Sequence, residues 1–225
     1  MTSIYQRALG SDFEKLHPQI QRRFGFSSSD GIAAIGRGVM EEVWRGPFYT
    51  LPFLYIGTFR SIMFPEVGRN IPFTIENYAF IDDFGRETVT WVRTFESTKR
   101  RRFDAYMIYS EKRNCIVDYL GTHEHLAVDI ELKVDETGGL NLRSGAQRFY
   151  EGPIAFKFPM LFSGIANVRE WYDDQQKCFR IEVDVRNKIW GRLFGYRGRF
   201  DVEWLKVEPG QVPSQVLPKR QDRRE

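Results

Sequence analysis

The chain has 225 residues, of which 42% are hydrophobic and 15% are aromatic, and its formal net charge is +3. This length and apolar content suffice for one large hydrophobic core. The 33 basic and 30 acidic residues are too evenly balanced to indicate nucleic-acid binding. The two cysteines, Cys115 and Cys178, form no CxxC motif. We expect both to be reduced packing residues of a cytoplasmic protein.

The first 26 residues are predicted to be helical. Apolar residues at helical spacing begin at Ile4, and Gly10 ends this first turn of helix. A second apolar stripe ends at Phe24, where Gly25 is a plausible terminator. Pro18 lies inside this stripe and predicts a kink or a restart of the helix. This N-terminal segment has no apolar stretch after a basic start, so we expect no secretory signal.

Residues 31–207 are predicted to be mainly β-strands. The clearest is Leu126–Val134, in which hydrophobic and polar residues alternate with a period of two. Short connections rich in turn formers, such as 82–85 and 136–139, indicate antiparallel neighbours. The ten predicted strands are Ile32–Trp44, Ile71–Ile81, Glu87–Phe95, Phe103–Tyr109, Cys115–Leu120, Leu126–Val134, Leu140–Tyr150, Ile165–Tyr172, Phe179–Val185 and Phe194–Trp204.

The most apolar stretch of the chain, residues 47–65, is too hydrophobic for a fully exposed helix. A membrane span is rejected, because Pro52 interrupts the stretch and Arg60 adds a charge to it. Three interpretations remain open. The segment, which includes Phe53 and Tyr55, is a helix that plugs the concave side of the sheet, a lid over an apolar cavity, or a docking surface for a membrane or a partner.

These elements predict an α+β fold that is mainly β. A sheet of about ten strands with one polar face tends to curl, so we expect a strongly curved antiparallel sheet or an open β-barrel. It wraps a helical segment, with the N-terminal helices packed outside. Residues 1–207 form one domain, and the proline-rich, charged residues 208–225 are predicted to be a disordered tail.

The order of motifs along residues 3–207 resembles an uncharacterised bacterial family known as domain of unknown function 4166. Each motif is weak alone, but their order along the whole chain is moderately specific. The matching pieces are Ile4-Tyr5 to Leu9-Gly10, Leu16-His17-Pro18 to Phe24, Gly36-Arg37-Gly38, Trp91–Phe95 with Phe103, Ile116–Gly121, Gly152-Pro153 to Pro159, and Gly195–Gly198.

The resemblance implies no activity, because this family has no established one. Its members often follow an NAD(P)-binding domain similar to saccharopine dehydrogenase, and this chain contains no strand–GxGxxG–helix pattern of that kind. Many relatives have Glu where this chain has Asp118, which keeps the charge but not the reach.

Arg93 is the most informative residue in the sequence. In a strand it shares one face with Val89, Trp91 and Phe95, and this face should point inward. A buried guanidinium needs a partner, because an uncompensated buried charge costs several kcal/mol. Two interpretations follow. Arg93 binds the carboxylate or phosphate head group of a ligand, or it pairs inside the protein, with Asp118 as the first choice.

Two other clusters carry charge. His123-Glu124-His125 has the residue types of a metal or acid–base site, but the only other histidine is His17, and we interpret the cluster as a polar turn. Lys99–Arg102 is a basic cluster between two strands, interpreted as a solvated hairpin tip or as a contact for anionic lipid or nucleic acid. No nucleophile elbow, phosphate-binding loop or metal-spaced cysteine motif occurs.

The leading hypothesis is a non-enzymatic binding module for an apolar or amphipathic small molecule, with no cofactor or metal. The alternative is an accessory domain that docks onto a dehydrogenase-like, NAD(P)-dependent partner, and the third is an enzyme with a dispersed site. Peripheral membrane contact stays open. The predicted ligand-binding residues are Arg93, Trp91, Phe95, Phe103, Asp118, Phe53 and Tyr55.

Overall fold

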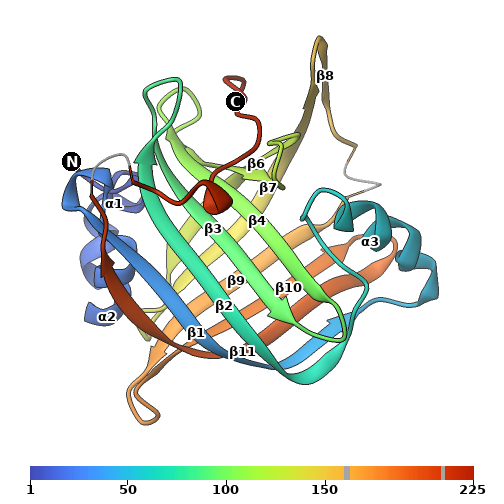
Figure 1. The fold of residues 1–225 in the computed structure, drawn as a ribbon, viewed down its shortest axis with the longest axis horizontal. Coiled ribbons are helices and arrows are strands. Elements are labelled where there is room, and N and C mark those ends of the chain that lie inside the picture. The colour runs from blue at the N-terminus through green and yellow to red at the C-terminus, as the bar shows by residue number, and fades with distance from the viewer. Residues whose placement is uncertain (160–162, 209–210) are drawn as a thin grey trace.

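The computed structural model of the chain describes residues 1–159, 163–208 and 211–225. Ten antiparallel strands form a closed barrel in the order β6-β5-β4-β3-β2-β1-β11-β10-β9-β7, and β6 pairs with β7 to complete the ring (Figure 1). An eleventh strand, β8, extends from β7. The prediction of a mainly β, curved antiparallel fold is confirmed. The barrel is closed, whereas an open barrel was one of the two predicted forms.

The strands alternate between inward-facing apolar and outward-facing polar residues, as the period-two patterns require. Their bounds are β1 Ile32–Arg45, β2 Gly68–Ile81, β3 Glu87–Glu96, β4 Arg100–Ser110, β5 Cys115–Leu120, β6 Leu126–Val134, β7 Leu140–Glu151, β8 Ile154–Lys157, β9 Ile165–Asp173, β10 Cys178–Asn187 and β11 Gly191–Lys206.

The α-helices are short and lie at the two ends of the barrel (Figure 1). Three α-helices and four 3₁₀ turns are present in the described residues. Their bounds are α1 Ile4–Leu9, η1 Gly10–Lys15, α2 Pro18–Phe24, η2 Ser28–Asp30, η3 Phe48–Thr50, α3 Leu51–Thr58 and η5 Ser214–Val216.

The N-terminal helices close one end of the barrel. Ser3 begins α1 with a capping box shared with Gln6, which satisfies two backbone N–H groups at the helix start. Pro18 is the first residue of α2, so the helix restarts there. The His17 N–H donates to the carbonyl of Gly138, 2.9 Å away in the β6–β7 turn, and fixes α2 on the barrel. Tyr5 and other apolar residues of this segment are therefore buried in the main core.

Helix α3 lies across the opposite end, which we call the mouth (Figure 1). It is held mainly at its two ends. The N–H of Gly46 donates to the carbonyl of Leu193 before the helix, and the N–H of Thr122 donates to the carbonyl of Arg60 after it, at 2.9 and 3.0 Å. Within α3 only Leu54 and Gly57 are buried. The helix is thus outside the barrel, whose interior is lined by aromatic and aliphatic side chains.

Residues 211–225 lie along the outer face of the barrel, although composition predicts a disordered tail over 208–225. Val216 is fully buried against Ile35, Tyr78 and Val92, which point outward from the barrel. The reason is that these outward-facing side chains are apolar, so the tail gains contacts that its own composition does not reveal. As a result, β3 is buried on both faces.

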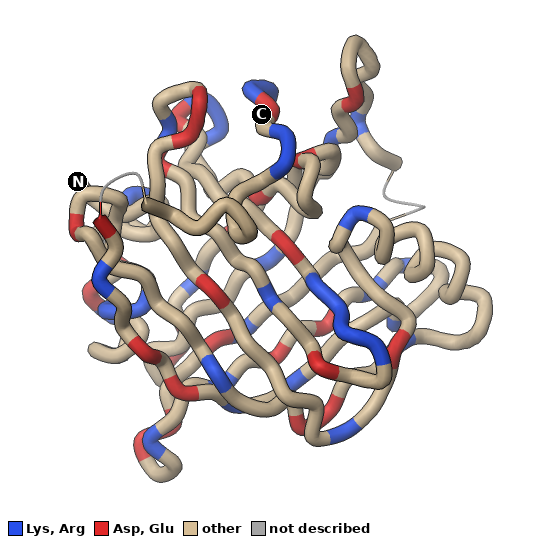
Figure 2. Tube along the Cα trace, viewed as in Figure 1, with Lys and Arg blue, Asp and Glu red and all other residues tan. Residues whose placement is uncertain are grey.

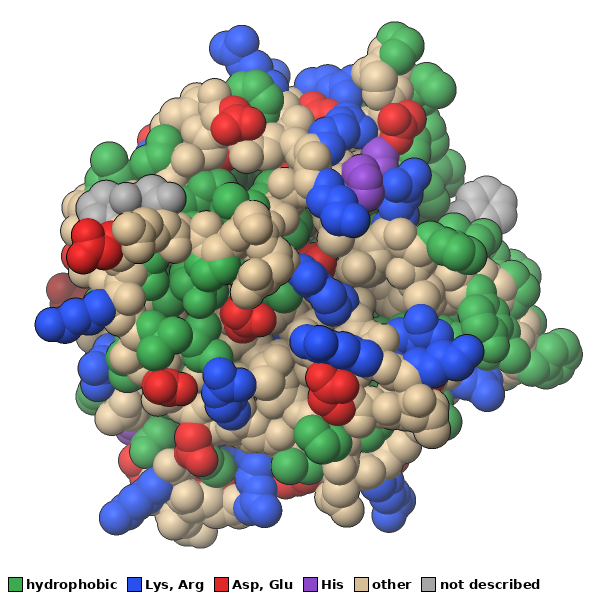
Figure 3. Space-filling view, viewed as in Figure 1, with side chains coloured by type: hydrophobic (Ala, Val, Ile, Leu, Met, Phe, Trp, Pro, Cys, Tyr) green, Lys and Arg blue, Asp and Glu red, His purple; other side chains and the backbone are tan. Residues whose placement is uncertain are grey.

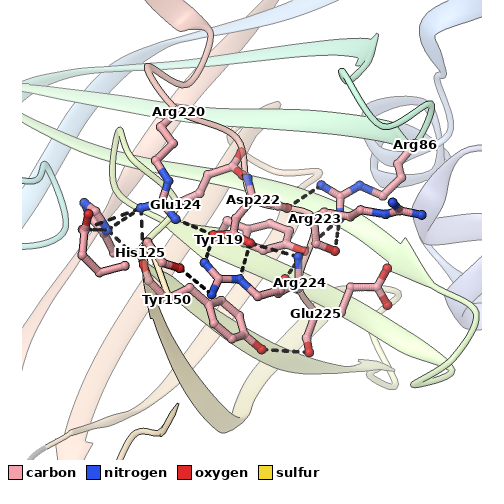
Figure 4. A network of polar contacts seen from close by, with 12 residues as sticks. Arg86, Tyr119, Glu124, His125, Tyr150, Arg220, Asp222, Arg223, Arg224 and Glu225 are labelled. Carbon is pink, nitrogen blue, oxygen red and sulfur yellow. Dashed lines mark hydrogen bonds and ion pairs between the residues drawn. The ribbon is translucent and has the colours of Figure 1, made fainter. Parts of the chain in front are cut away.

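Polar contacts hold the end of this tail. The N–H of Asp222 donates to Glu124 Oε2 at 2.6 Å, and the tail carbonyl groups accept from Arg86 and Tyr119 (Figure 4). Burial raises the pKa of Glu124 to about 8, although the Asp222 N–H acts in the opposite direction. Arg220 reaches the mouth, where its Nη1 lies 3.0 Å from His125 Nδ1.

Candidate functional site

A small cavity of about 100 Å³ lies inside the barrel, toward the mouth. Side chains from β3, β4 and β5 form one of its walls, because alternate residues of these neighbouring strands point inward. The polar groups on this wall are Arg93 and Asp118, set among apolar side chains that include Trp91, Phe103 and Met107.

Arg93 is 4% exposed and has no carboxylate partner in the described part of the chain. Its Nε donates to the carbonyl of Phe103 and its Nη1 to the hydroxyl of Tyr196, both at 3.2 Å. The guanidinium also lies 3.8 Å from the ring centroid of Phe103 and 5.5 Å from that of Trp91. Two neutral hydrogen bonds and two aromatic faces stabilise the charge only in part.

Asp118 is 6% exposed, and its Oδ1 has no hydrogen-bond partner among the described residues. Burial raises the pKa of Asp118 to about 7, while the positive charge of Arg93 acts to lower it. The carboxyl group is therefore close to half-protonated at neutral pH.

Strand register explains why Arg93 and Asp118 do not form the internal pair that the sequence left open. Arg93 lies opposite Phe103 on β4, whereas Asp118 lies opposite Met107 on the same strand. The two levels are four residues apart, or roughly 13 Å along the strand. Both side chains line the cavity from different levels, and neither neutralises the other by contact.

Tyr5, from the closed end of the barrel, forms hydrogen bonds with two residues of the cavity wall. Trp91 Nε1 donates to the Tyr5 hydroxyl at 2.7 Å, and the hydroxyl lies 3.4 Å from the Met107 sulfur. Burial raises the pKa of Tyr5, so its phenol stays neutral. Tyr5 thus satisfies the indole N–H, whereas Arg93 Nη2 and Asp118 Oδ1 form no hydrogen bond with the described residues.

The mouth holds a second, larger pocket of about 350 Å³ beneath α3. The mouth pocket and the interior cavity share lining residues. The two spaces are therefore neighbours along one path from the mouth into the barrel. The shared residues are Ile62, Met63, Leu126, Ser163 and Gly164. The mouth pocket is mostly apolar, with His125 and Glu151 at its edge, where His125 Nδ1 lies 2.7 Å from Glu151 Oε2.

The seven predicted site residues divide into three groups. Arg93, Trp91, Phe103 and Asp118 line the interior cavity, and Phe53 lines the mouth pocket. Phe95 is fully buried but packs against other rings, 4.8 Å from Phe64 and 5.0 Å from Tyr196, away from both spaces. Tyr55 is 54% exposed and lines neither.

The sequence interpretation missed a buried ion pair between Arg23 of α2 and Glu170 of β9. Both side chains are almost completely buried, and Arg23 Nη1 and Nη2 and Glu170 Oε2 have no hydrogen-bond partner among the described residues. Burial raises the pKa of Glu170. A signal was present: Arg23 follows Ile20 by three residues and so lies on the apolar face of its helix.

The remaining charged clusters are engaged elsewhere. In the Lys99–Arg102 cluster, Arg101 pairs with Glu66 and Arg102 with Asp104, at 2.5 and 2.9 Å. His123 and His125 stack with ring centroids 5.5 Å apart. No group of three or more potential metal ligands comes together within the described residues. Over the same residues, no helix is long and apolar enough to cross a membrane.

Comparison with known proteins places the chain in a family of unknown activity. The chain is 35% identical over 204 residues to the uncharacterized protein YndH of Bacillus subtilis (strain 168), covering 90% of this chain and 98% of that protein. No solved structure matches. Residues 16–200 match the family described as "Domain of unknown function (DUF4166)". The chain therefore belongs to the DUF4166 family.

Proposed function

We propose that this protein is a non-enzymatic binding module for an amphipathic small molecule with a carboxylate end. The carboxylate occupies the interior cavity, and the apolar body extends through the mouth. The observation that carries this proposal is Arg93, a buried guanidinium that faces a cavity and has no ion pair within the described residues.

The head-group chemistry follows from the two cavity groups. Arg93 has one further nitrogen, Nη2, for which the described residues provide no hydrogen bond, and a carboxylate is its natural acceptor. Such a ligand brings one negative charge into the cavity that Asp118 also lines and raises the pKa of this side chain further. Asp118 then takes up a proton and remains neutral, so the bound state has one guanidinium and one ligand carboxylate.

The two spaces suit a molecule with a polar end and an apolar body. The interior cavity of about 100 Å³ and the mouth pocket of about 350 Å³ together lie in the range of roughly 300–1,000 Å³ that small-molecule sites occupy. The wall that joins them is apolar at Ile62, Met63 and Leu126. Burying an alkyl chain there contributes about 0.8 kcal/mol for each CH₂ group.

Helix α3 serves as the lid of this path. It is anchored before and after the helix but buries only Leu54 and Gly57 of its eight residues. Few buried contacts mean that local opening costs little, which is what a segment covering an entrance requires.

Mass spectrometry of the intact protein under native conditions tests the proposal. The wild-type protein is expected to carry an acidic amphiphile after purification from its native host, and Arg93→Leu is expected to lose it. A matched control is Arg37→Leu, because Arg37 is 65% exposed and its nearest carboxylate oxygen is 3.8 Å away. Wild type and Arg93→Leu carrying the same ligand with equal stability would show that Arg93 does not anchor it.

A further inference from the structure

Exposed apolar side chains gather around the mouth. Eleven of the fifteen large hydrophobic residues that are exposed lie in the segments at this end, which include α3 and β8, and Phe59 and Phe48 are the most open of these at 85% and 80%. Figure 3 shows them as hydrophobic clusters at the right-hand edge, over α3 and β8, with basic side chains beside them. We define the apolar rim by its most prominent members, Phe48, Ile56, Phe59, Ile154, Phe156 and Ile189.

The rim belongs to three segments that are distant in sequence but meet around one opening. The Tyr49 hydroxyl donates to the carbonyl of Trp190 at 3.1 Å, which joins the α3 segment to the loop before β11. Phe156 of β8 packs 5.3 Å from Phe149 of β7, which lines the mouth pocket. The rim therefore surrounds the entrance and is not a random scatter of surface residues.

The charges on the segments that carry the apolar rim are one-sided. The segments 43–65, 152–168 and 185–200, which carry most of the rim, contain no Asp or Glu. Figure 2 shows the same absence of red along α3. Each rim segment places a basic residue directly beside an exposed apolar one, and these cations have no ion pair within the described residues: Arg60 beside Phe59, Lys157 beside Phe156, and Lys188 beside Ile189.

The turns at the closed end carry both signs of charge. Asp82, Asp83, Glu111, Asp135, Glu136 and Asp174 lie there together with Arg86, Lys112, Arg113 and Lys177. The mouth differs in that basic residues without an ion pair among the described residues lie beside exposed apolar side chains. A negatively charged surface attracts this arrangement.

We propose that the apolar rim docks onto an anionic lipid bilayer, with the mouth facing the membrane. Phe59 and its neighbours enter the boundary between head groups and acyl chains, while Arg60, Lys157 and Lys188 stay at the level of the lipid phosphates. Alternating apolar and basic residues on separate loops fit this layered surface. A flat protein partner would instead favour one continuous face with paired charges.

This proposal does not depend on a ligand in the interior, so the two can fail separately. If both hold, the entrance of the barrel opens directly into the lipid phase, which is the source or the destination of an acidic amphiphile.

Co-sedimentation with lipid vesicles tests the proposal. The wild-type protein is expected to bind vesicles made of equal parts phosphatidylglycerol and phosphatidylcholine, and to bind pure phosphatidylcholine more weakly. The double variant Ile56→Ser/Phe59→Ser should lose at least about tenfold in apparent affinity for the anionic vesicles. Arg60→Gln/Lys188→Gln should lose roughly tenfold for the anionic vesicles and little for the neutral ones.

The control is Ile81→Ser, which alters an equally apolar side chain, 47% exposed, at the end of β2 away from the mouth. It should bind like wild type. A wild-type protein that stays in the supernatant overturns the proposal, as does an equal loss in Ile81→Ser. Light scattering gives a third contrary result: a wild-type dimer that Ile56→Ser/Phe59→Ser dissociates assigns the rim to a second copy of the chain.

Discussion

The two ends of the barrel use similar residues in opposite ways. At the closed end, Tyr5, Ile20 and Phe24 are 0–2% exposed, and a buried Arg23–Glu170 pair lies among them. At the mouth, Phe48 and Phe59, which flank the apolar helix α3, remain open to solvent. The apolar side chains at the closed end are buried by other parts of the chain, whereas those at the mouth are exposed.

This difference between the two ends shows that apolar content alone does not determine whether a segment belongs to the core. The N-terminal helices have an apolar stripe on one face, so they bury that face on the barrel. Helix α3 is apolar on all sides, and it buries chiefly Leu54 while its other faces remain exposed. Segments of the second kind indicate a surface with a partner or a ligand.

The largest expected effect comes from the same substitution at the two ends. Phe24→Ala should lower the free energy of unfolding by about 3–5 kcal/mol, because it leaves a cavity among Tyr5, Trp91 and neighbouring core residues. Phe59→Ala should change it by less than about 0.5 kcal/mol, because this ring is already in solvent. Urea denaturation measures both, and equal losses would contradict the distinction between the two ends.

A smaller effect is expected from Asp118, whose folded pKa of about 7 lies above its ordinary value of about 4. The folded protein keeps a proton that the unfolded chain releases, so stability falls as pH rises between these values. Asp118→Asn should therefore match wild type near pH 4 and exceed it by up to about 4 kcal/mol above pH 8.

Asp129 provides the opposite control. Despite a contribution from burial that raises it, the pKa of Asp129 is lowered by hydrogen bonds from Arg113 and Arg148. Asp129→Asn should accordingly destabilise the protein near neutral pH. Chemical denaturation over a pH series separates the two, and an Asp118→Asn curve parallel to wild type would show that Asp118 titrates normally.

The smallest predicted effect concerns ligand affinity. If a bound carboxylate keeps Asp118 protonated, binding takes up one proton above about pH 7. The affinity for decanoate should then fall as pH rises above this value, by at most about tenfold for each pH unit. Asp118→Asn should abolish this slope in isothermal titration calorimetry, and a slope of the same size in the variant would assign it to another group.

Much of the fold could be predicted, because hydrophobic and polar residues alternate along strands that have one side in the core and one side in solvent. Leu126–Val134 and Cys115–Leu120 have the predicted bounds. The alternation also places Arg93 inward among aromatic rings. Strand β8 was missed, because Ile154–Lys157 is only four residues long and its residues are all exposed, so hydrophobic and polar residues do not alternate there.

The remaining features of the fold and the site depend on contacts between residues that are distant in the sequence, which no local sequence pattern reveals. The register between β3, β4 and β5 separates Arg93 from Asp118, and the sequence alone allowed them to pair. The position of the tail depends on outward-facing side chains such as Val92. These side chains are buried only because Val216 of the tail packs on them. Phe95 and Tyr55 were assigned to the site because of their neighbours in the sequence. In the structure, Phe95 is buried in the core and Tyr55 is exposed to solvent.

The most direct test compares the affinities of decanoate and decanol for wild type and Arg93→Leu by calorimetry near neutral pH. The account predicts that wild type prefers the carboxylate by about tenfold or more, because Arg93 forms a charge-assisted hydrogen bond with it. Arg93→Leu should lose this preference and still bind decanol. Equal affinity of the wild-type protein for both compounds, or binding of neither, would contradict a carboxylate site inside the barrel.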